Sequence, residues 1–83
     1  MYQVVILEQV ENQIKKLDRS VQERIFATLE RIKIRPQDFL EKLVGEKGYK
    51  LRVGDYRLFI DILEDKLVLL VIEFGHRKNS SKK

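Results

Sequence analysis

The chain has 83 residues, of which 43% are hydrophobic and 36% charged, with one histidine and no cysteine. This length suits one domain with a single core, and the composition argues against disorder and against a membrane span. The lack of cysteine excludes a disulfide framework, a thiol nucleophile and a thiolate metal site. We expect one domain over residues 1–83, in the cytoplasm because no export signal opens the chain, without a metal or other cofactor.

The net charge of +4 is concentrated at the carboxyl end. Four of the 17 basic residues follow Glu73, which leaves thirteen to balance the 13 acids at or before it. These four are Arg77, Lys78, Lys82 and Lys83. A basic tail over residues 75–83 is typical of a chain that meets a polyanion, although a frayed, solubilising terminus is the simpler explanation for the last two lysines.

The chain opens with a predicted strand and a predicted helix. Residues 2–7 are β-branched and apolar on both faces, which indicates a strand buried within a sheet. Over residues 8–18 the apolar positions Val10, Ile14 and Leu17 recur at helical spacing. This helix is expected to pack its single apolar stripe on the sheet.

A second helix is predicted to begin at Ser20, which forms an S-x-x-E capping box with Glu23. Pro36 ends it, because proline supplies no amide hydrogen and restricts the residue before it. Residues 37–47 then predict a short helical turn or an ordered loop. The expected buried stripe comprises Val21, Ile25, Leu29 and Ile32, broadened by Phe26.

Two alternating runs, residues 49–53 and 56–62, flank Gly54-Asp55 and predict an antiparallel hairpin. One face of this hairpin is apolar, and the other carries Lys50, Arg52 and Arg57. Three cations on one rigid face repel each other, and an anion such as a phosphate backbone relieves that repulsion. Alternatively, these are solvated charges paired with the nearby acids, which are Asp55, Asp61 and Glu73.

After a turn at Glu64-Asp65, residues 66–74 predict a strand whose core, residues 67–72, has no polar residue. Such a strand must be covered on both faces. The helices cover one face, so we expect a partner chain on part of the other, with the 37–47 loop as the alternative cover. The element order predicts an α+β domain: an N-terminal strand, a helical hairpin and an antiparallel sheet of three further strands.

The run from Tyr49 to Arg57, followed about twenty residues later by Gly75-His76-Arg77, resembles the RelE/ParE superfamily of bacterial and archaeal toxins. The resemblance covers the full chain, and its Gly-His-Arg is closer to the RelE members. It implies a toxin of a type II toxin-antitoxin system that acts as a metal-independent, ribosome-dependent endoribonuclease on messenger RNA. The implied partners are the ribosome, the mRNA and a RelB-like antitoxin, with which a heterotetramer can form.

The resemblance also implies roles for particular residues. Arg57 and Arg77 match the family arginines that stabilise the phosphate in the transition state, and Lys50 and Arg52 match basic positions on the strand before. A guanidinium offers a planar fork of donors to the developing charge. Lys50 is then a candidate acceptor of the 2′-hydroxyl proton, and His76 a candidate donor to the leaving group. The remaining expected RNA contacts are Lys47, Lys78, Phe59 and Phe74.

In one place the chain departs from this family. Many RelE-like toxins carry a tyrosine a few residues after the Gly-His-Arg, whereas this chain has Asn79-Ser80-Ser81 and no tyrosine beyond Tyr56. Base stacking then falls to Phe59 or Phe74. Two other functions stay open on the same scaffold: a ParE-like inhibitor of DNA gyrase, and a non-catalytic toxin or RNA-binding module.

Overall fold

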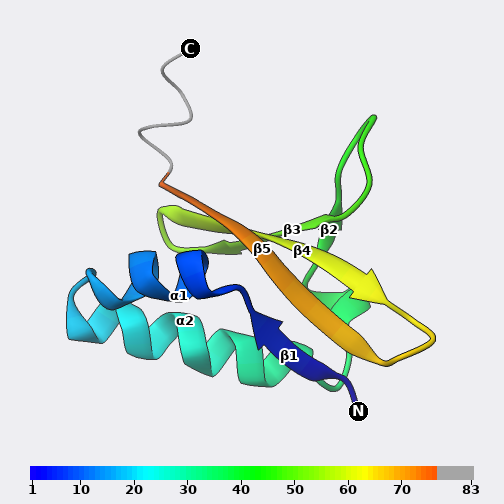
Figure 1. The fold of residues 1–83 in the computed structure, drawn as a ribbon, viewed down its shortest axis with the longest axis horizontal. Helices are drawn as coiled ribbons and strands as arrows, with labels where there is room; N and C mark the ends of the chain where they lie inside the picture. Colours follow the sequence, from blue (N-terminus) through cyan, green and yellow to red (C-terminus); the bar gives the residue numbers. More distant parts are fainter. Residues whose placement is uncertain (77–83) are drawn as a thin grey trace.

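The computed structural model describes residues 1–76. The strands are β1 (Gln3–Ile6), β2 (Glu41–Lys42), β3 (Tyr49–Val53), β4 (Tyr56–Leu63) and β5 (Val68–His76), and the helices are α1 (Glu8–Lys15), α2 (Arg19–Ile32) and the short η1 (Pro36–Asp38). The five strands form one sheet in the order β1-β5-β4-β3-β2. The helices α1 and α2 lie together on one face of it (Figure 1). The predicted α+β architecture is confirmed.

The core lies between the helices and the sheet, where the two predicted helical stripes meet the apolar face of the strands. Val10 and Ile14 of α1 are fully buried, as predicted, and so are Ile25 and Ile32 of α2. Phe26 does not broaden the α2 stripe, because it is 36% exposed. It follows Ile25 by one residue, which rotates it by about 100° away from the stripe. The core strand residues are Leu51, Val53, Leu58, Ile60, Leu69 and Val71. Within residues 1–76, neither helix is long and apolar enough to cross a membrane.

Strand β1 lies at an edge of the sheet, and the prediction of a strand buried within the sheet was wrong. Among the strands of residues 1–76 it pairs only with β5, in parallel, and this parallel pairing was not expected. Val4 and Ile6 pack against the core, whereas Val5 points to the other face and is 39% exposed. An apolar run shows which residues favour burial, but it does not show how many neighbours the strand will have.

The connection between α1 and α2 differs from the prediction at both helix ends. Helix α2 begins at Arg19 after an Asp18 N-cap without a side-chain hydrogen bond, so the Ser20 capping box was wrong. Ser20 lies inside the first turn, and Glu23 instead pairs with Arg19 at 3.7 Å. Helix α1 ends at Lys15, three residues earlier than expected. The Gln22 side-chain amide donates hydrogen bonds to the carbonyls of Lys15 (3.2 Å) and Leu17 (2.8 Å), which satisfies backbone groups that the helix end leaves free.

The β3–β4 hairpin forms as predicted. Val53 pairs with Tyr56 across a two-residue turn. Gly54 has φ +61, and Asp55 is not among the residues with positive φ, which is the pattern of a type II′ turn. Glycine adopts this conformation without the steric clash that a Cβ would cause. The space beside it is also occupied, since a Cβ on Gly54 would lie 3.0 Å from a terminal nitrogen of Arg24 in α2.

Replacing Gly54 with alanine is therefore expected to lower the free energy of unfolding by about 1–2 kcal/mol. The matched control is Gly75→Ala in β5, where φ is unexceptional and the nearest atom to an added Cβ is a Phe59 carbon at 4.0 Å. Urea denaturation followed by circular dichroism measures both changes. Equal stability losses in the two variants would show that the turn imposes no special backbone conformation.

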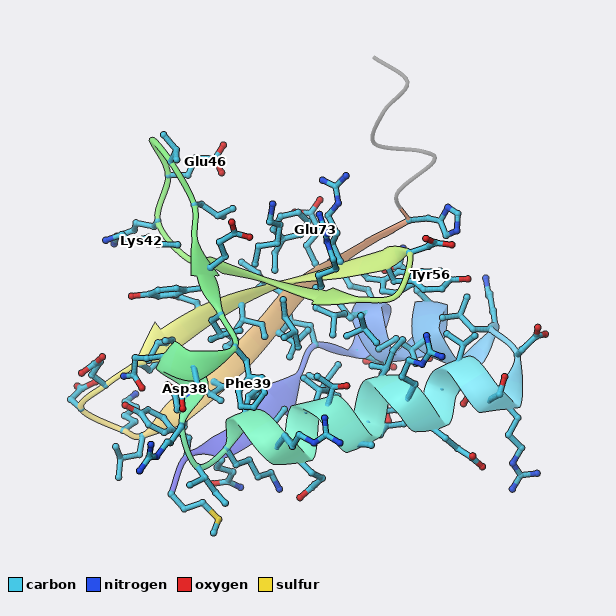
Figure 2. All side chains as sticks on the ribbon, turned by 180° about the vertical axis from the view of Figure 1, so that it is seen from behind. Asp38, Phe39, Lys42, Glu46, Tyr56 and Glu73 are labelled. Carbon is cyan, nitrogen blue, oxygen red and sulfur yellow. The ribbon has the colours of Figure 1, made fainter. Side chains whose placement is uncertain are left out.

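The start and the middle of β5 were not predicted correctly. The strand begins at Val68, not at residue 66, because Leu67 has φ 53 and belongs to the preceding turn. A bulge then interrupts the register: Ile60 pairs with Val71, but Phe59 pairs with Glu73. The extra residue, Ile72, reverses the alternation of side chains. Val71 consequently faces the helices while Glu73, two residues later, faces the opposite side (Figure 2).

Candidate nucleic-acid interface

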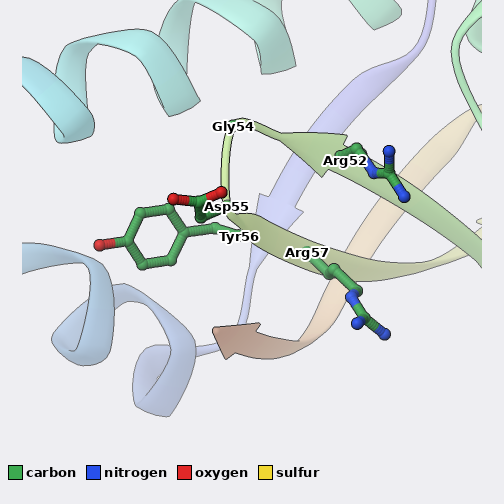
Figure 3. Close-up of a pocket in the computed structure, with 5 residues that line it drawn as sticks. All are labelled: Arg52, Gly54, Asp55, Tyr56 and Arg57. Atoms are coloured by element: carbon green, nitrogen blue, oxygen red, sulfur yellow. The ribbon is translucent and has the colours of Figure 1, made fainter. Parts of the chain in front are cut away.

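The sheet face opposite the helices, here called the open face, carries the three predicted cations. Lys50 and Arg52 alternate along β3, and Arg52 is the register partner of Arg57 on β4. Figure 3 shows both guanidinium groups directed away from the helices, whereas Tyr56 points toward them. Directly opposed side chains on antiparallel strands have Cβ atoms about 5 Å apart. The fold therefore holds two arginines close together on one surface.

The acids expected to neutralise these arginines do not do so. Among residues 1–76, neither Arg52 nor Arg57 takes part in an ion pair. Asp55, Asp61 and Glu73, the three expected partners, form no ion pair with any cation of the described residues. Two facing guanidinium groups without a carboxylate between them repel each other, so an anion bound between them lowers the electrostatic energy.

Lys50 differs from the arginines because it has an acidic partner that the sequence did not suggest. Its Nζ lies 3.8 Å from Oε1 of Glu41, its register partner on β2. We had expected residues 37–47 to form a helical turn or an ordered loop. They form the turn η1, the short strand β2 and a loop back to β3. Gly45 and Gly48, which both have positive φ, were a hairpin signal that could have revealed β2.

The predicted aromatic contacts lie on two different faces. Phe59 is half-buried on the open face between Lys50 and Glu73, its partners on β3 and β5. Phe74 packs against the core instead, and its ring stacks on Tyr56 with centroids 5.4 Å apart. Only Phe59 therefore lies beside the cations.

His76 also lies on the helix side of the sheet. It is the register partner of Tyr56, and the two ring centroids are 4.7 Å apart in an edge-on contact. The structure thus brings Tyr56, Phe74 and His76 together on the helix side, and Tyr56 also lines the small recess beside Arg52 and Arg57. Arg77 and Lys78 lie outside the described residues, and Lys47 is exposed in the loop between β2 and β3.

The site is an open surface and not an enclosed pocket. The recess at the hairpin turn, between Arg52 and Arg57, has a volume of only ≈ 10 Å³, about enough for one water molecule. Small-molecule sites are typically concave and hundreds of Å³ in volume. Cations on an open strand face, with Arg52 exposed and Lys50 and Arg57 half-buried, suit a polyanion better than a small metabolite. Among residues 1–76, no three histidine or acidic side chains are grouped to hold a metal ion.

A groove of ≈ 330 Å³ lies next to the cations on the open face. It is lined by Leu43, Val44, Glu46, Lys47, Phe59, Ile72 and Glu73. The loop between β2 and β3 therefore borders this part of the open face but does not cover it, so the alternative prediction that residues 37–47 cover this face was wrong. Ile72 remains 37% exposed and Val44 98% exposed. This apolar surface is available to a partner.

Comparison with known proteins gives one family and several related structures. The family model described as ParE toxin of type II toxin-antitoxin system, parDE, matches residues 4–80. A curated Escherichia coli protein described as a RelE-like toxin is 29% identical over 82 residues, which cover 95% of this chain and 86% of the relative.

Among solved structures, a chain of the intact E. coli RelBE toxin-antitoxin complex is 28% identical with a TM-score of 0.77, over 92% of this chain and 96% of that one. The isolated E. coli RelE toxin is 26% identical with a TM-score of 0.78, and the match covers 92% of this chain and 84% of that toxin. A chain of the RelE-RelB complex from Pyrococcus horikoshii shares the fold at 22% identity, with a TM-score of 0.77. This match covers 92% of this chain and 94% of that one.

Proposed function

The chain belongs to the ParE toxin family of type II toxin-antitoxin systems, as its resemblance to the RelE/ParE superfamily predicted, and from this premise we propose that it is an endoribonuclease that cuts messenger RNA on the ribosome. One observation carries the proposal: Arg52 and Arg57 face each other across the hairpin without an ion pair among the described residues. Such a pair suits a phosphate that gains charge during a reaction.

In the proposed reaction, the ribose 2′-oxygen attacks the adjacent phosphorus and the bond from phosphorus to the 5′-oxygen breaks. The products are a cyclic phosphate and a free 5′-hydroxyl. Arg57 and Arg52 donate hydrogen bonds to the non-bridging oxygens, whose charge increases in the transition state. An arginine is a poor proton acceptor, so proton transfer falls to other groups. Lys50, which lies on the arginine face, accepts the proton of the 2′-hydroxyl. His76, the candidate donor, lies on the other face, so a water molecule protonates the leaving 5′-oxygen.

We also propose that an antitoxin holds this toxin inactive. The related structures include the E. coli RelBE complex and the archaeal RelE-RelB complex. On this chain, the exposed apolar residues of the open face and the adjacent groove are surfaces that such a partner would cover. A partner seated there would lie next to the arginine row and hinder the approach of RNA to it.

Induced expression followed by mapping of new mRNA 5′ ends tests the proposed activity. We expect growth arrest and new ends inside translated reading frames, at fixed positions relative to the codons. Changing the start codon of a reporter mRNA, which prevents its translation, should remove these ends from that reporter. Growth arrest without any new 5′ ends would contradict an endoribonuclease.

A second candidate function is inhibition of DNA gyrase, and the ParE description of the matching family model favours it. Two assays with purified components, plasmid supercoiling by gyrase and cell-free translation, distinguish the two functions. A gyrase inhibitor would block supercoiling of relaxed plasmid and leave cell-free translation unaffected. The proposed endoribonuclease would do the reverse, and RNA binding without new 5′ ends would identify a non-catalytic module.

A further inference from the structure

A row of four side chains crosses the open face at the level of Lys50. Register pairing places Glu41 of β2, Lys50 of β3, Phe59 of β4 and Glu73 of β5 next to one another in this order. The neighbouring row contains Arg52, Arg57 and Gly75. The lysine row is therefore bounded by an acid on each side, whereas the described part of the arginine row holds none.

The acid at the outer end of the lysine row is in contact with Lys50. Glu41 Oε1 lies 3.8 Å from Lys50 Nζ, with the two side chains 74% and 26% exposed. Strand β2 holds the acid in position, since it pairs with β3 and the Leu43 amide donates to the Gly48 carbonyl at 3.1 Å. The lysine is thus the less exposed of the two partners, and the carboxylate lies beside it on the edge strand β2.

We propose that Glu41 restrains RNA binding by holding Lys50 in this ion pair, so that phosphate binding depends on Arg52 and Arg57 unless the RNA displaces the carboxylate. This inference rests on the proposed function. An exposed ion pair is weak, so an RNA phosphate close to Lys50 can replace the Glu41 carboxylate. Binding of that phosphate is nevertheless weakened, because the Glu41–Lys50 ion pair must first break. Glu41 therefore sets how many cations of the site a bound RNA engages.

The test measures how the affinity for RNA depends on salt. Each phosphate of a single strand that a cation neutralises contributes about 0.7 to the slope of log affinity against log salt. Glu41→Gln should free Lys50, tighten binding of a short single-stranded RNA by about two- to fivefold at low salt, and steepen the slope by about 0.7. Fluorescence anisotropy with a labelled oligonucleotide and the full-length protein gives both quantities.

Two variants separate the ion pair from a general change in charge. Glu46→Gln removes the same charge from the loop that follows β2, but Glu46 has no ion pair among the described residues. The affinity of this variant for RNA and its salt slope should therefore stay close to those of the wild type. Adding Lys50→Ala to Glu41→Gln should abolish the gain, because the two side chains act as a unit. Equal gains in Glu41→Gln and Glu46→Gln, or a gain that persists without Lys50, would overturn the inference.

Arg57→Ala in the same titration tests the proposed function separately. If Arg57→Ala weakens RNA binding while Glu41→Gln changes nothing, the phosphate site stands and the role of Glu41 is wrong. If the wild type does not bind RNA, or Arg57→Ala binds as well as the wild type, the phosphate site is wrong and both proposals fall.

Discussion

Replacing Arg57 with alanine is expected to lower cleavage of translated mRNA by a factor of about 10²–10³ and to relieve growth arrest. Removing one preorganised donor from a developing oxyanion has an effect of this size. Arg57 is half-buried on the central strand β4, and its guanidinium is directed to the open face next to Arg52 (Figure 3). Arg57→Lys should recover part of the activity, because a lysine retains the charge but loses the planar fork of donors.

Cleavage is measured as the abundance of new mRNA 5′ ends after induction, with circular dichroism to verify the fold. The control is Arg31→Ala, which removes an exposed arginine from α2 on the other side of the sheet and should leave cleavage unchanged. The resemblance to RelE-like toxins assigns the same role to Arg77, so Arg77→Ala should show a similar loss. Unchanged cleavage in Arg57→Ala would remove the proposed transition-state role of the open face.

Replacing Leu69 with alanine is expected to lower the free energy of unfolding by about 2–5 kcal/mol. Leu69 is fully buried in β5, between Val4 of β1 and Ile62 of β4, on the face that the helices cover. The cavity left by its side chain cannot close without moving the sheet or the helices. A domain of this length has a total stability of about 4–12 kcal/mol, so the variant should be partly unfolded at growth temperature and lose toxicity.

The control for this truncation is Val5→Ala in β1. Val5 lies on the open face and is 39% exposed, so we expect a loss below about 1 kcal/mol. Urea denaturation monitored by circular dichroism compares the two variants. Similar losses at both positions would mean that the open face is packed as tightly as the helix side, and that no apolar surface remains for an antitoxin.

The sequence predicted the elements whose residues interact with near neighbours in the chain. The helical stripes at Val10 and Ile14 and at Ile25 and Ile32 follow from a 3.6-residue period, and all four residues are buried. The hairpin at Gly54-Asp55 follows from a two-residue alternation on each side of a glycine. The same alternation, together with the two-residue turn that sets the register of the hairpin, placed Arg52 and Arg57 on one face.

Apart from the β3–β4 hairpin, only the tertiary structure decided which strands are neighbours and in which register. It brings Glu41 beside Lys50 and His76 beside Tyr56, although 9 and 20 positions separate the members of these pairs. It places β1 at an edge, and the bulge at Ile72 directs Glu73 to the open face. A local pattern cannot predict these outcomes, because a register depends on the packing of the whole sheet against the helices, and one inserted residue reverses every later side chain of a strand.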